Sequence, residues 1–199
     1  MSGEPKDLGA TREKAAQGDA REQVYLGVCY AKGHGVPQDY KEAMKWCRLA
    51  VEQGDAAAQT LLGVFYDEGN GVPQDCTEAV KWWRLAAEQQ EAGAQLNLGV
   101  AYYEGTGVQQ DYTEAAKWWK LAAEQGKYPA PFLLGNAYKE GRGVPQDYAQ
   151  AFAWLVISET QGFGLSKKDL SKFLKKMTPA QIEEGRRLSR EYAEKFGKK

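Results

Sequence analysis

Few side chains in this 199-residue chain have the chemistry of a catalytic or metal-binding group. His34 is the only histidine, so a zinc site built from several histidines is excluded. A cysteine nucleophile paired with His34 would need Cys29, Cys47 or Cys76 at the tip of a loop. No two of these cysteines have the C-x-x-C spacing of a zinc or redox site. We expect three half-buried small apolar residues, with a single disulfide bond among them as the alternative.

A Gly-x-Gly motif that occurs four times could suggest phosphate binding. Phosphate-binding loops of that kind follow a strand and carry a third glycine, whereas here a helical pattern precedes the motif and the third glycine is missing. An aspartate closes each copy of the motif, and all four are adequately explained as helix caps: Asp39, Asp75, Asp111 and Asp147. The sequence therefore predicts no catalytic residues, no metal site and no cofactor.

The elements that would position these residues repeat along the chain. The segment Gly33-His34-Gly35-Val36-Pro37-Gln38-Asp39 recurs in related form from residues 69, 105 and 141, which gives a period of 36. Other columns keep the same register, starting with Leu26, Gly27, Tyr30, Ala43 and Trp46 in the first repeat and ending with Leu134, Gly135, Tyr138, Ala151 and Trp154 in the fourth.

Each repeat has the pattern of two helices, which we name helix A and helix B. In residues 56–68 of the second repeat, Leu62 and Tyr66 share one face, and Gly63 beside them suggests close approach of a neighbouring backbone, because an interior glycine costs about 1 kcal/mol relative to alanine. The helix B pattern, about residues 76–89, is apolar over a wide arc. We expect the recurring tryptophans Trp82 and Trp118 to be buried. Stacked pairs of this size would share one core, as in an α-solenoid.

The repeated pattern resembles the Sel1-like repeat, a member of the tetratricopeptide-like superfamily. The resemblance lies in Ala-x-x-x-Leu-Gly-x-x-Tyr, then Gly-x-Gly-Val-Pro-Gln-Asp, then Ala-x-x-Trp-x-x-x-Ala-x-x-Gln-Gly, over residues 17–162. It implies an all-α fold: a right-handed α-α superhelix, or solenoid, of about four 36-residue helix-turn-helix repeats with a C-terminal helical cap. It also implies that helix A lines the concave side, and that the protein is an adaptor or scaffold without shared catalytic machinery.

The two ends depart from the repeat. We expect residues 1–16 to be an N-terminal cap or truncated repeat, and residues 163–199 to be a basic C-terminal helical cap, because the end units of a solenoid need a polar outer face. Thr178-Pro179-Ala180-Gln181 has the form of a capping box at the start of the last helix. The stretch from Lys176 to Ile182 is also similar to the ending of bacterial Sel1-like proteins.

Charge is distributed unevenly although the whole chain carries only −1. Residues 1–162 hold 15 basic and 22 acidic side chains, a net charge of −7, whereas residues 163–199 hold 11 basic and 5 acidic ones, a net charge of +6. The tail lysines are either the solvated side of the cap or an electrostatic patch for an acidic partner or surface: Lys167, Lys168, Lys172, Lys175 and Lys176. The overall balance argues against a nucleic-acid partner.

The composition gives no sign of membrane insertion or disorder. The apolar stretches are only a few residues long, so we expect no direct insertion into a bilayer. The start of the chain has no apolar signal-peptide region, which predicts a cytoplasmic protein from the chain as written, and a periplasmic or secreted one if a leader has been removed. We expect a monomer, with an oligomer as the alternative.

The residues that vary while the scaffold repeats are the candidates for partner binding. If helix A lines the concave side, three of its columns face the groove, and a contiguous apolar surface there would bind a protein or peptide. The predicted groove residues are Val24, Val28, Thr60, Val64, Asp67, Leu96, Val100, Tyr103, Phe132, Asn136 and Lys139. The alternative for some of them is burial against the next helix A.

The first functional hypothesis is thus a non-catalytic interaction scaffold, in which repeats three and four carry most of the affinity. A second hypothesis comes from the resemblance, since Cys-rich relatives have been linked to β-lactam binding and hydrolysis. Those relatives carry spaced cysteine pairs, which this chain lacks, and it has no Ser-x-x-Lys motif. A third hypothesis is a structural spacer within a membrane-associated complex.

Overall fold

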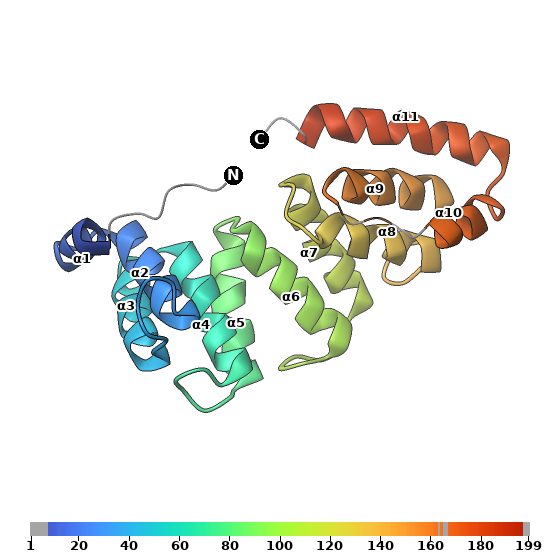
Figure 1. Cartoon of the computed structure of the whole chain (residues 1–199). Helices are drawn as coiled ribbons and strands as arrows, with labels where there is room; N and C mark the ends of the chain where they lie inside the picture. The colour runs from blue at the N-terminus through green and yellow to red at the C-terminus, as the bar shows by residue number, and fades with distance from the viewer. Residues whose placement is uncertain (1–7, 163, 165–166, 197–199) are drawn as a thin grey trace. The chain divides into compact units, whose positions relative to one another are not determined.

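The computed structural model describes residues 8–162, 164 and 167–196, and within these residues it contains only helices (Figure 1). The described helices are α1 (Leu8–Ala16), α2 (Ala20–Lys32), α3 (Tyr40–Glu52), α4 (Ala56–Glu68), α5 (Cys76–Glu88), α6 (Ala92–Glu104), α7 (Tyr112–Glu124), α8 (Ala130–Glu140), α9 (Tyr148–Thr160), α10 (Lys167–Leu174) and α11 (Pro179–Phe196). The prediction of an all-α fold built from helix-turn-helix repeats is confirmed. The chain divides into two compact units, Met1–Ala94 and Gln95–Lys199, which are described one at a time.

Consecutive helices pair within each repeat, as the sequence pattern predicts. In the first unit α2 packs on α3 and α4 packs on α5, and in the second unit α8 packs on α9. In three repeats a glutamine that ends helix B donates a hydrogen bond at 2.8 Å to a glutamine near the start of helix A: Gln53 to Gln23, Gln89 to Gln59 and Gln125 to Gln95. Pro131 occupies that position in the fourth repeat, and the amide of Gln161 bonds the Gly126 carbonyl instead.

The recurring turn is held by hydrogen bonds from its last two residues. The Gln74 side chain donates to the carbonyl oxygen of Asp67 at 2.7 Å, and the Asp75 amide donates to the Tyr66 carbonyl oxygen at 2.8 Å. Gly69 ends α4 in the left-handed conformation, and the Asp75 carboxylate accepts from the Glu78 amide at 2.9 Å, capping α5. The interpretation of the repeated aspartates as caps is confirmed in all four turns.

The recurring glycine of helix A marks close contact with helix B of the same repeat. A Cβ placed on Gly63 would lie 2.5 Å from Cδ1 of Trp83 and 3.1 Å from the carbonyl oxygen of Ala79. On Gly135 it would lie 2.8 Å from Cγ of Leu155. The expectation of a close backbone approach is therefore confirmed, and these glycines let the two helices of a repeat approach each other.

The tryptophan prediction was only partly right. The invariant column is half-buried in the first three repeats, including Trp82 and Trp118, and only Trp154 in the fourth repeat is fully buried. The buried rings of the second and third repeats are their chain neighbours Trp83 and Trp119, which are 5% and 3% exposed. The reason is geometric, since Trp83 and Trp119 point at the helix A glycines, Gly63 and Gly99.

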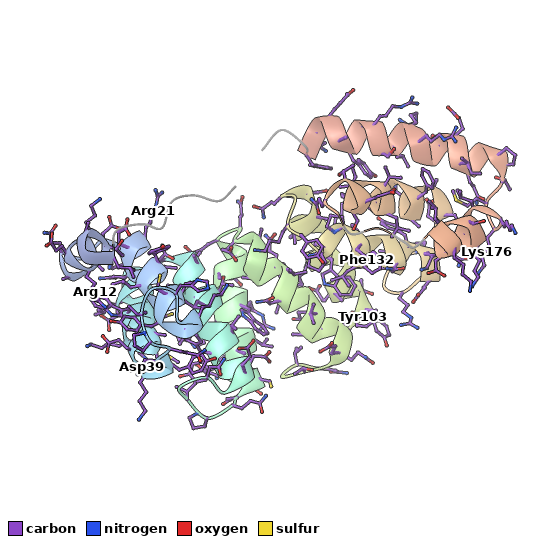
Figure 2. All side chains as sticks on the ribbon, in the orientation of Figure 1. Arg12, Arg21, Asp39, Tyr103, Phe132 and Lys176 are labelled. Carbon is purple, nitrogen blue, oxygen red and sulfur yellow. The ribbon has the colours of Figure 1, made fainter. Side chains whose placement is uncertain are left out.

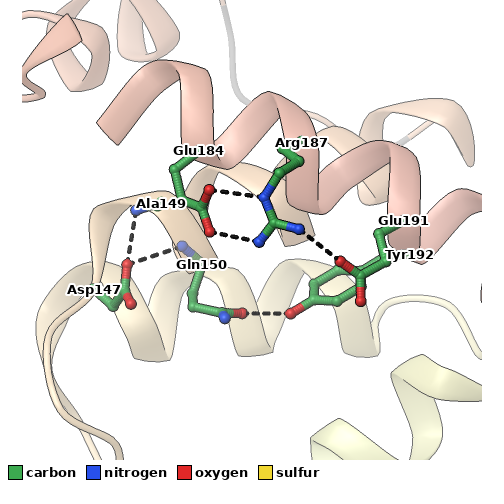
Figure 3. Close-up of polar contacts among 7 residues, drawn as sticks. All are labelled: Asp147, Ala149, Gln150, Glu184, Arg187, Glu191 and Tyr192. Atoms are coloured by element: carbon green, nitrogen blue, oxygen red, sulfur yellow. Dashed lines mark hydrogen bonds and ion pairs between the residues drawn. The ribbon is translucent and has the colours of Figure 1, made fainter. Parts of the chain in front are cut away.

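The C-terminal segment packs on the fourth repeat through α11. Gly185 repeats the glycine contact, because a Cβ there would lie 3.0 Å from Cβ of Phe152. The Trp154 ring stacks on Tyr192 with the ring centroids 4.6 Å apart. The Tyr192 hydroxyl donates to Gln150 at 2.7 Å (Figure 3). On the outer side of α11, Arg187 bridges the carboxylates of Glu184 and Glu191 (Figure 3). The aromatic contacts therefore cover the last apolar face of the repeats.

The predicted capping box is confirmed at the start of α11. The Thr178 amide donates to the Gln181 side chain at 2.9 Å, and the Gln181 amide donates to the Thr178 hydroxyl at 3.2 Å. Residues 163, 165–166 and 197–199 of the predicted C-terminal cap lie outside the described residues.

At the other end of the chain, α1 packs on α2, and the Gln23 side chain donates to the Ala15 carbonyl oxygen at 3.0 Å. Residues 1–7 of the predicted N-terminal cap lie outside the described residues.

Candidate partner-binding site

The cysteines are placed as packing residues rather than as a reactive group. Cys29 and Cys47 are fully buried and Cys76 is half-buried, so the prediction of half-burial holds for Cys76 alone. All three thiols are free, which excludes the alternative of a disulfide bond in this structure. Cys47 donates to the Ala58 carbonyl oxygen at 3.1 Å, and burial raises its pKa to about 12. Burial, followed by the neighbouring Asp67 carboxylate, also raises the pKa of Cys76.

Two further observations concern metal binding and membrane crossing. Within the described residues, no three histidine, cysteine, aspartate or glutamate side chains come close enough together to hold a metal ion. None of the helices described is both long enough and apolar enough to cross a membrane.

In the first unit all five predicted groove residues are half-buried: Val24, Val28, Thr60, Val64 and Asp67. Some of them already pack against or bond other residues of the fold. Val24 packs against the buried cluster that includes Met44 and Phe65. The Thr60 hydroxyl lies 2.9 Å from both the Ala56 carbonyl oxygen and the Glu91 carboxylate, and its one proton is shared between these two acceptors. Packing therefore accounts for part of this set, as the alternative interpretation allows.

In the second unit a hollow forms between the third and fourth repeats. It has a volume of about 340 Å³, and we name it the tyrosine hollow. Its lining comes from α6, α7, α8 and the turn after α8: Val100, Tyr103, Glu104, Trp119, Leu133, Asn136, Ala137, Glu140 and Arg142. Three of these, Val100, Tyr103 and Asn136, are predicted groove residues.

A larger hollow adjoins it on the side of the C-terminal segment. It has a volume of about 710 Å³, and we name it the basic hollow. Its lining comes from α8, the turn after α8, the first residue of α9, α10 and the turn after α10. The lining residues are Phe132, Asn136, Lys139, Glu140, Arg142, Gln146, Tyr148, Asp169, Lys172, Phe173 and Lys176. The two hollows share Asn136, Glu140 and Arg142 in their linings, so they are neighbours in the second unit, and we name the pair the recess.

Tyr103 is held firmly in the wall of the tyrosine hollow. Its ring centroid lies 5.3 Å from that of Trp119 and 5.2 Å from that of Tyr112. The Arg142 guanidinium lies 6.0 Å from the centroids of both tyrosine rings and donates a hydrogen bond to the Tyr103 hydroxyl. That hydrogen bond is the main cause of a raised Arg142 pKa, followed by Glu140, whose carboxylate lies 3.2 Å from the guanidinium.

Three predicted residues on α8 line the basic hollow, and one of them, Asn136, also lines the tyrosine hollow. The Asn136 amide donates to the Phe132 carbonyl oxygen at 3.0 Å, and its oxygen accepts a hydrogen bond from the Lys139 ammonium. Phe132 packs against the buried cluster of α9 and α10 that includes Phe173. Figure 2 labels Tyr103 on α6, Phe132 on α8 and Lys176 beyond α10.

The predicted groove residues and the residues that line the hollows overlap only in part. Leu96 lines neither hollow and packs against the buried cluster around Trp119. Arg142 is not among the predicted groove residues, and Lys172 and Lys176 were predicted only as part of the solvated side of the cap or of an electrostatic patch. The available signal for Arg142 was that its column otherwise reads histidine, asparagine and threonine.

Comparison with known proteins finds a known repeat in the same four segments of the chain. The sequence profile described as the Sel1 repeat matches residues 23–55, 56–91, 92–127 and 130–170. No curated protein shows significant sequence similarity to the chain.

Two solved structures are similar in both sequence and fold. One is a protective antigen present in uropathogenic Escherichia coli strains and displaying an SLR fold, with 43% identity, a TM-score of 0.74 and coverage of 79% of this chain and 34% of that one. The other is a Sel1 repeat protein from Oxalobacter formigenes, with 39% identity, a TM-score of 0.67 and coverage of 74% of this chain and 59% of that one. The chain thus spans less than two thirds of the length of either relative.

Proposed function

This chain belongs to the Sel1 repeat family, whose members are generally non-catalytic protein-interaction modules, and we propose that it is an adaptor that binds a protein or peptide on the helix-A face of its third and fourth repeats. In this proposal the recess formed by the tyrosine hollow and the basic hollow is the partner site.

One observation carries the proposal. Of the six groove residues predicted in the second unit, five line the recess: Val100, Tyr103, Phe132, Asn136 and Lys139. They were selected because they vary between repeats while the scaffold does not. A recess lined by residues that the scaffold leaves free to vary supports recognition of a specific partner.

The chemistry of the recess suits a peptide. Pockets that hold small molecules typically have volumes of about 300–1,000 Å³. Both hollows fall in this range, so each has room for a side chain of a bound peptide. Tyr103 is held by Trp119 and Arg142, so it can bury its exposed edge against a partner with little loss of conformational entropy. Such fixed aromatic groups typically dominate interface energies.

An enzymatic role finds less support in the described residues. The raised pKa values of Cys47 and Cys76 disfavour the thiolate, which is the nucleophilic form. His34 is exposed on the turn between α2 and α3. The β-lactam hypothesis is tested directly by incubating the purified chain with a chromogenic β-lactam, and hydrolysis above the buffer rate would contradict the proposal of a non-catalytic adaptor.

Affinity capture from cell extract with the folded chain, followed by mass spectrometry, tests the proposed site. The informative variant is Asn136→Arg, because Asn136 lines both hollows and its replacement by a larger side chain fills the recess. We prefer it to Tyr103→Ala with Phe132→Ala, because both rings also pack against buried clusters.

The matched control is Ala193→Arg on α11, where the side chain is exposed and lines neither hollow. Both variants should keep the circular dichroism and the melting temperature of the parent. We expect Asn136→Arg to lose the captured partner and Ala193→Arg to retain it. Equal retention by the two variants would place partner binding outside the recess.

A further inference from the structure

The basic hollow has two walls, one from the repeats and one from the C-terminal segment that follows them. One wall is α8 and the turn after it, which belong to the fourth repeat, and the other is α10 with the residues that follow it. We propose that the C-terminal segment is part of the partner site, and that the basic hollow binds an acidic peptide segment that carries one aromatic or aliphatic anchor side chain. This inference rests on the proposed function and specifies the partner.

The charges that line the hollow do not cancel. Four cations and two carboxylates line it: Lys139, Arg142, Lys172, Lys176, Glu140 and Asp169. Glu140 lies 3.2 Å from the Arg142 guanidinium, and Asp169 lies 4.0 Å from the Lys172 ammonium, so each carboxylate already has a cation beside it. Two positive charges therefore remain, one on each wall.

Lys139 and Lys176 are the residues that carry this excess charge. Lys139 is half-buried, and its ammonium donates to the neutral side chain of Asn136, which positions the charge without neutralising it. Lys176 is exposed in the turn after α10 and uses its backbone amide to bond the Phe173 carbonyl oxygen. Two cations on opposite walls can each donate hydrogen bonds to a carboxylate of a segment that lies between them.

The aromatic residues of the same hollow supply the apolar contact. Phe132 comes from α8, Tyr148 from the start of α9 and Phe173 from α10. The rings of Tyr148 and Phe173 meet edge to face with centroids 5.7 Å apart, which holds α10 against the start of α9. A side chain of the partner that enters between the walls would bury its apolar area against these rings.

The wider charge distribution favours an acidic partner over a nucleic acid. Residues 163–199 carry a net charge of +6 and would steer an acidic segment toward the hollow, whereas the rest of the chain carries −7 and would repel a long polyanion. Since a peptide presents carboxylates and an apolar side chain within a few residues, it matches both features of the hollow.

Selection from a random dodecapeptide library displayed on phage, with the full chain immobilised, tests the inference. We expect enrichment of peptides with two or more Asp or Glu residues flanking an aromatic or aliphatic residue. Fluorescence anisotropy with the selected peptides should show at least about tenfold weaker binding to Lys139→Glu with Lys176→Glu, because attraction is replaced by repulsion at both walls. Binding to the parent should also weaken as the NaCl concentration rises.

The matched control reverses two exposed lysines of the same unit that lie outside the hollow, Lys120→Glu with Lys127→Glu, and it should bind within about twofold of the parent. Selected peptides without acidic enrichment, which nevertheless lose binding to Asn136→Arg, would overturn this inference and leave the proposed function standing. Peptides that bind all variants equally, or the absence of any selected peptide, would count against both. Binding to phosphatidylserine vesicles that depends on Lys139 and Lys176, with no acidic peptide selected, would also overturn it.

Discussion

Trp83 should stabilise the fold more than its neighbour Trp82, although Trp82 belongs to the column that recurs in every repeat. Trp83 is 5% exposed, its indole N–H donates to the Thr60 carbonyl oxygen at 3.2 Å, and its ring lies against Gly63. Trp82 is half-buried, and its indole N–H has no hydrogen-bond partner. The buried contact and the hydrogen bond are thus both concentrated in Trp83.

Replacement of Trp83 by alanine should lower the free energy of unfolding by about 4 kcal/mol, since truncation of a buried large aromatic residue costs about 3–5 kcal/mol. For a chain of this length, that loss corresponds to a fall in melting temperature of about 8–16 °C. Trp82→Ala should cost about half as much, because only part of the ring leaves a packed environment. Leu85→Ala, on a side chain that is 46% exposed, should cost about 0.5 kcal/mol or less and serves as the control.

The measurement is thermal and urea unfolding followed by circular dichroism at 222 nm, with all three variants and the parent under the same conditions. A larger fall in melting temperature for Trp82→Ala than for Trp83→Ala would refute the reasoning, because it would show that the recurring column, and not the ring at the glycine, holds each helix pair together.

Gly143→Ala should destabilise the chain by more than about 2 kcal/mol, because Gly143 has a φ of +73° and a new Cβ would collide with the Tyr112 carbonyl group. Gly162→Ala should cost only about 1 kcal/mol, because Gly162 has a φ of +83° but a new Cβ there would meet nothing within 4 Å. Urea melts of the two variants would distinguish these losses. Because the native state keeps the Cys47 thiol protonated up to about pH 12 while the unfolded chain loses the proton above pH 9.0, stability should fall with rising pH between these values, by about 1.4 kcal/mol per pH unit from this group. Cys47→Ala should remove that part of the slope in alkaline urea melts, and an unchanged slope would contradict the assignment. A chain that ends at Gly162 lacks the rings that cover Trp154 and should aggregate in light scattering, so a soluble and equally stable monomer would show that the C-terminal segment does not cap the repeats.

The local structure of this protein could be read from its sequence because local interactions determine it. The turn motif contains its own glycine, its own hydrogen-bonding glutamine and its own capping aspartate. In the second repeat, the end of one helix and the start of the next therefore depend only on residues 65–78. The same holds for the capping box of Thr178 and Gln181. Recurrence at a fixed spacing then predicted the repeat architecture, since identical units solve the same packing problem.

Burial within helix B could not be read in the same way. Trp82 and Trp83 are adjacent and equally apolar, and recurrence favoured Trp82. Which ring enters the core depends on the rotation of the helix about its axis, and that rotation is set by the close approach at Gly63. Adjacent side chains of a helix point about 100° apart, so the rotation that buries one of the two rings leaves the other at the edge of the contact, and only the packed helix pair decides between them.

In the candidate site, too, part of the arrangement follows from the sequence and part only from tertiary packing. Variation between repeats selected Tyr103 and Phe132 as candidates, because that signal lies in the sequence columns themselves, and each of them lines one of the two hollows. Arg142 bonds Tyr103, and Lys139 and Lys176 line the same hollow, although the members of each pair are 37 or more positions apart in the chain. Their proximity follows from how helices of successive repeats pack and from where α10 lies against α8. Those distances result from tertiary packing, and no local pattern of residues encodes them.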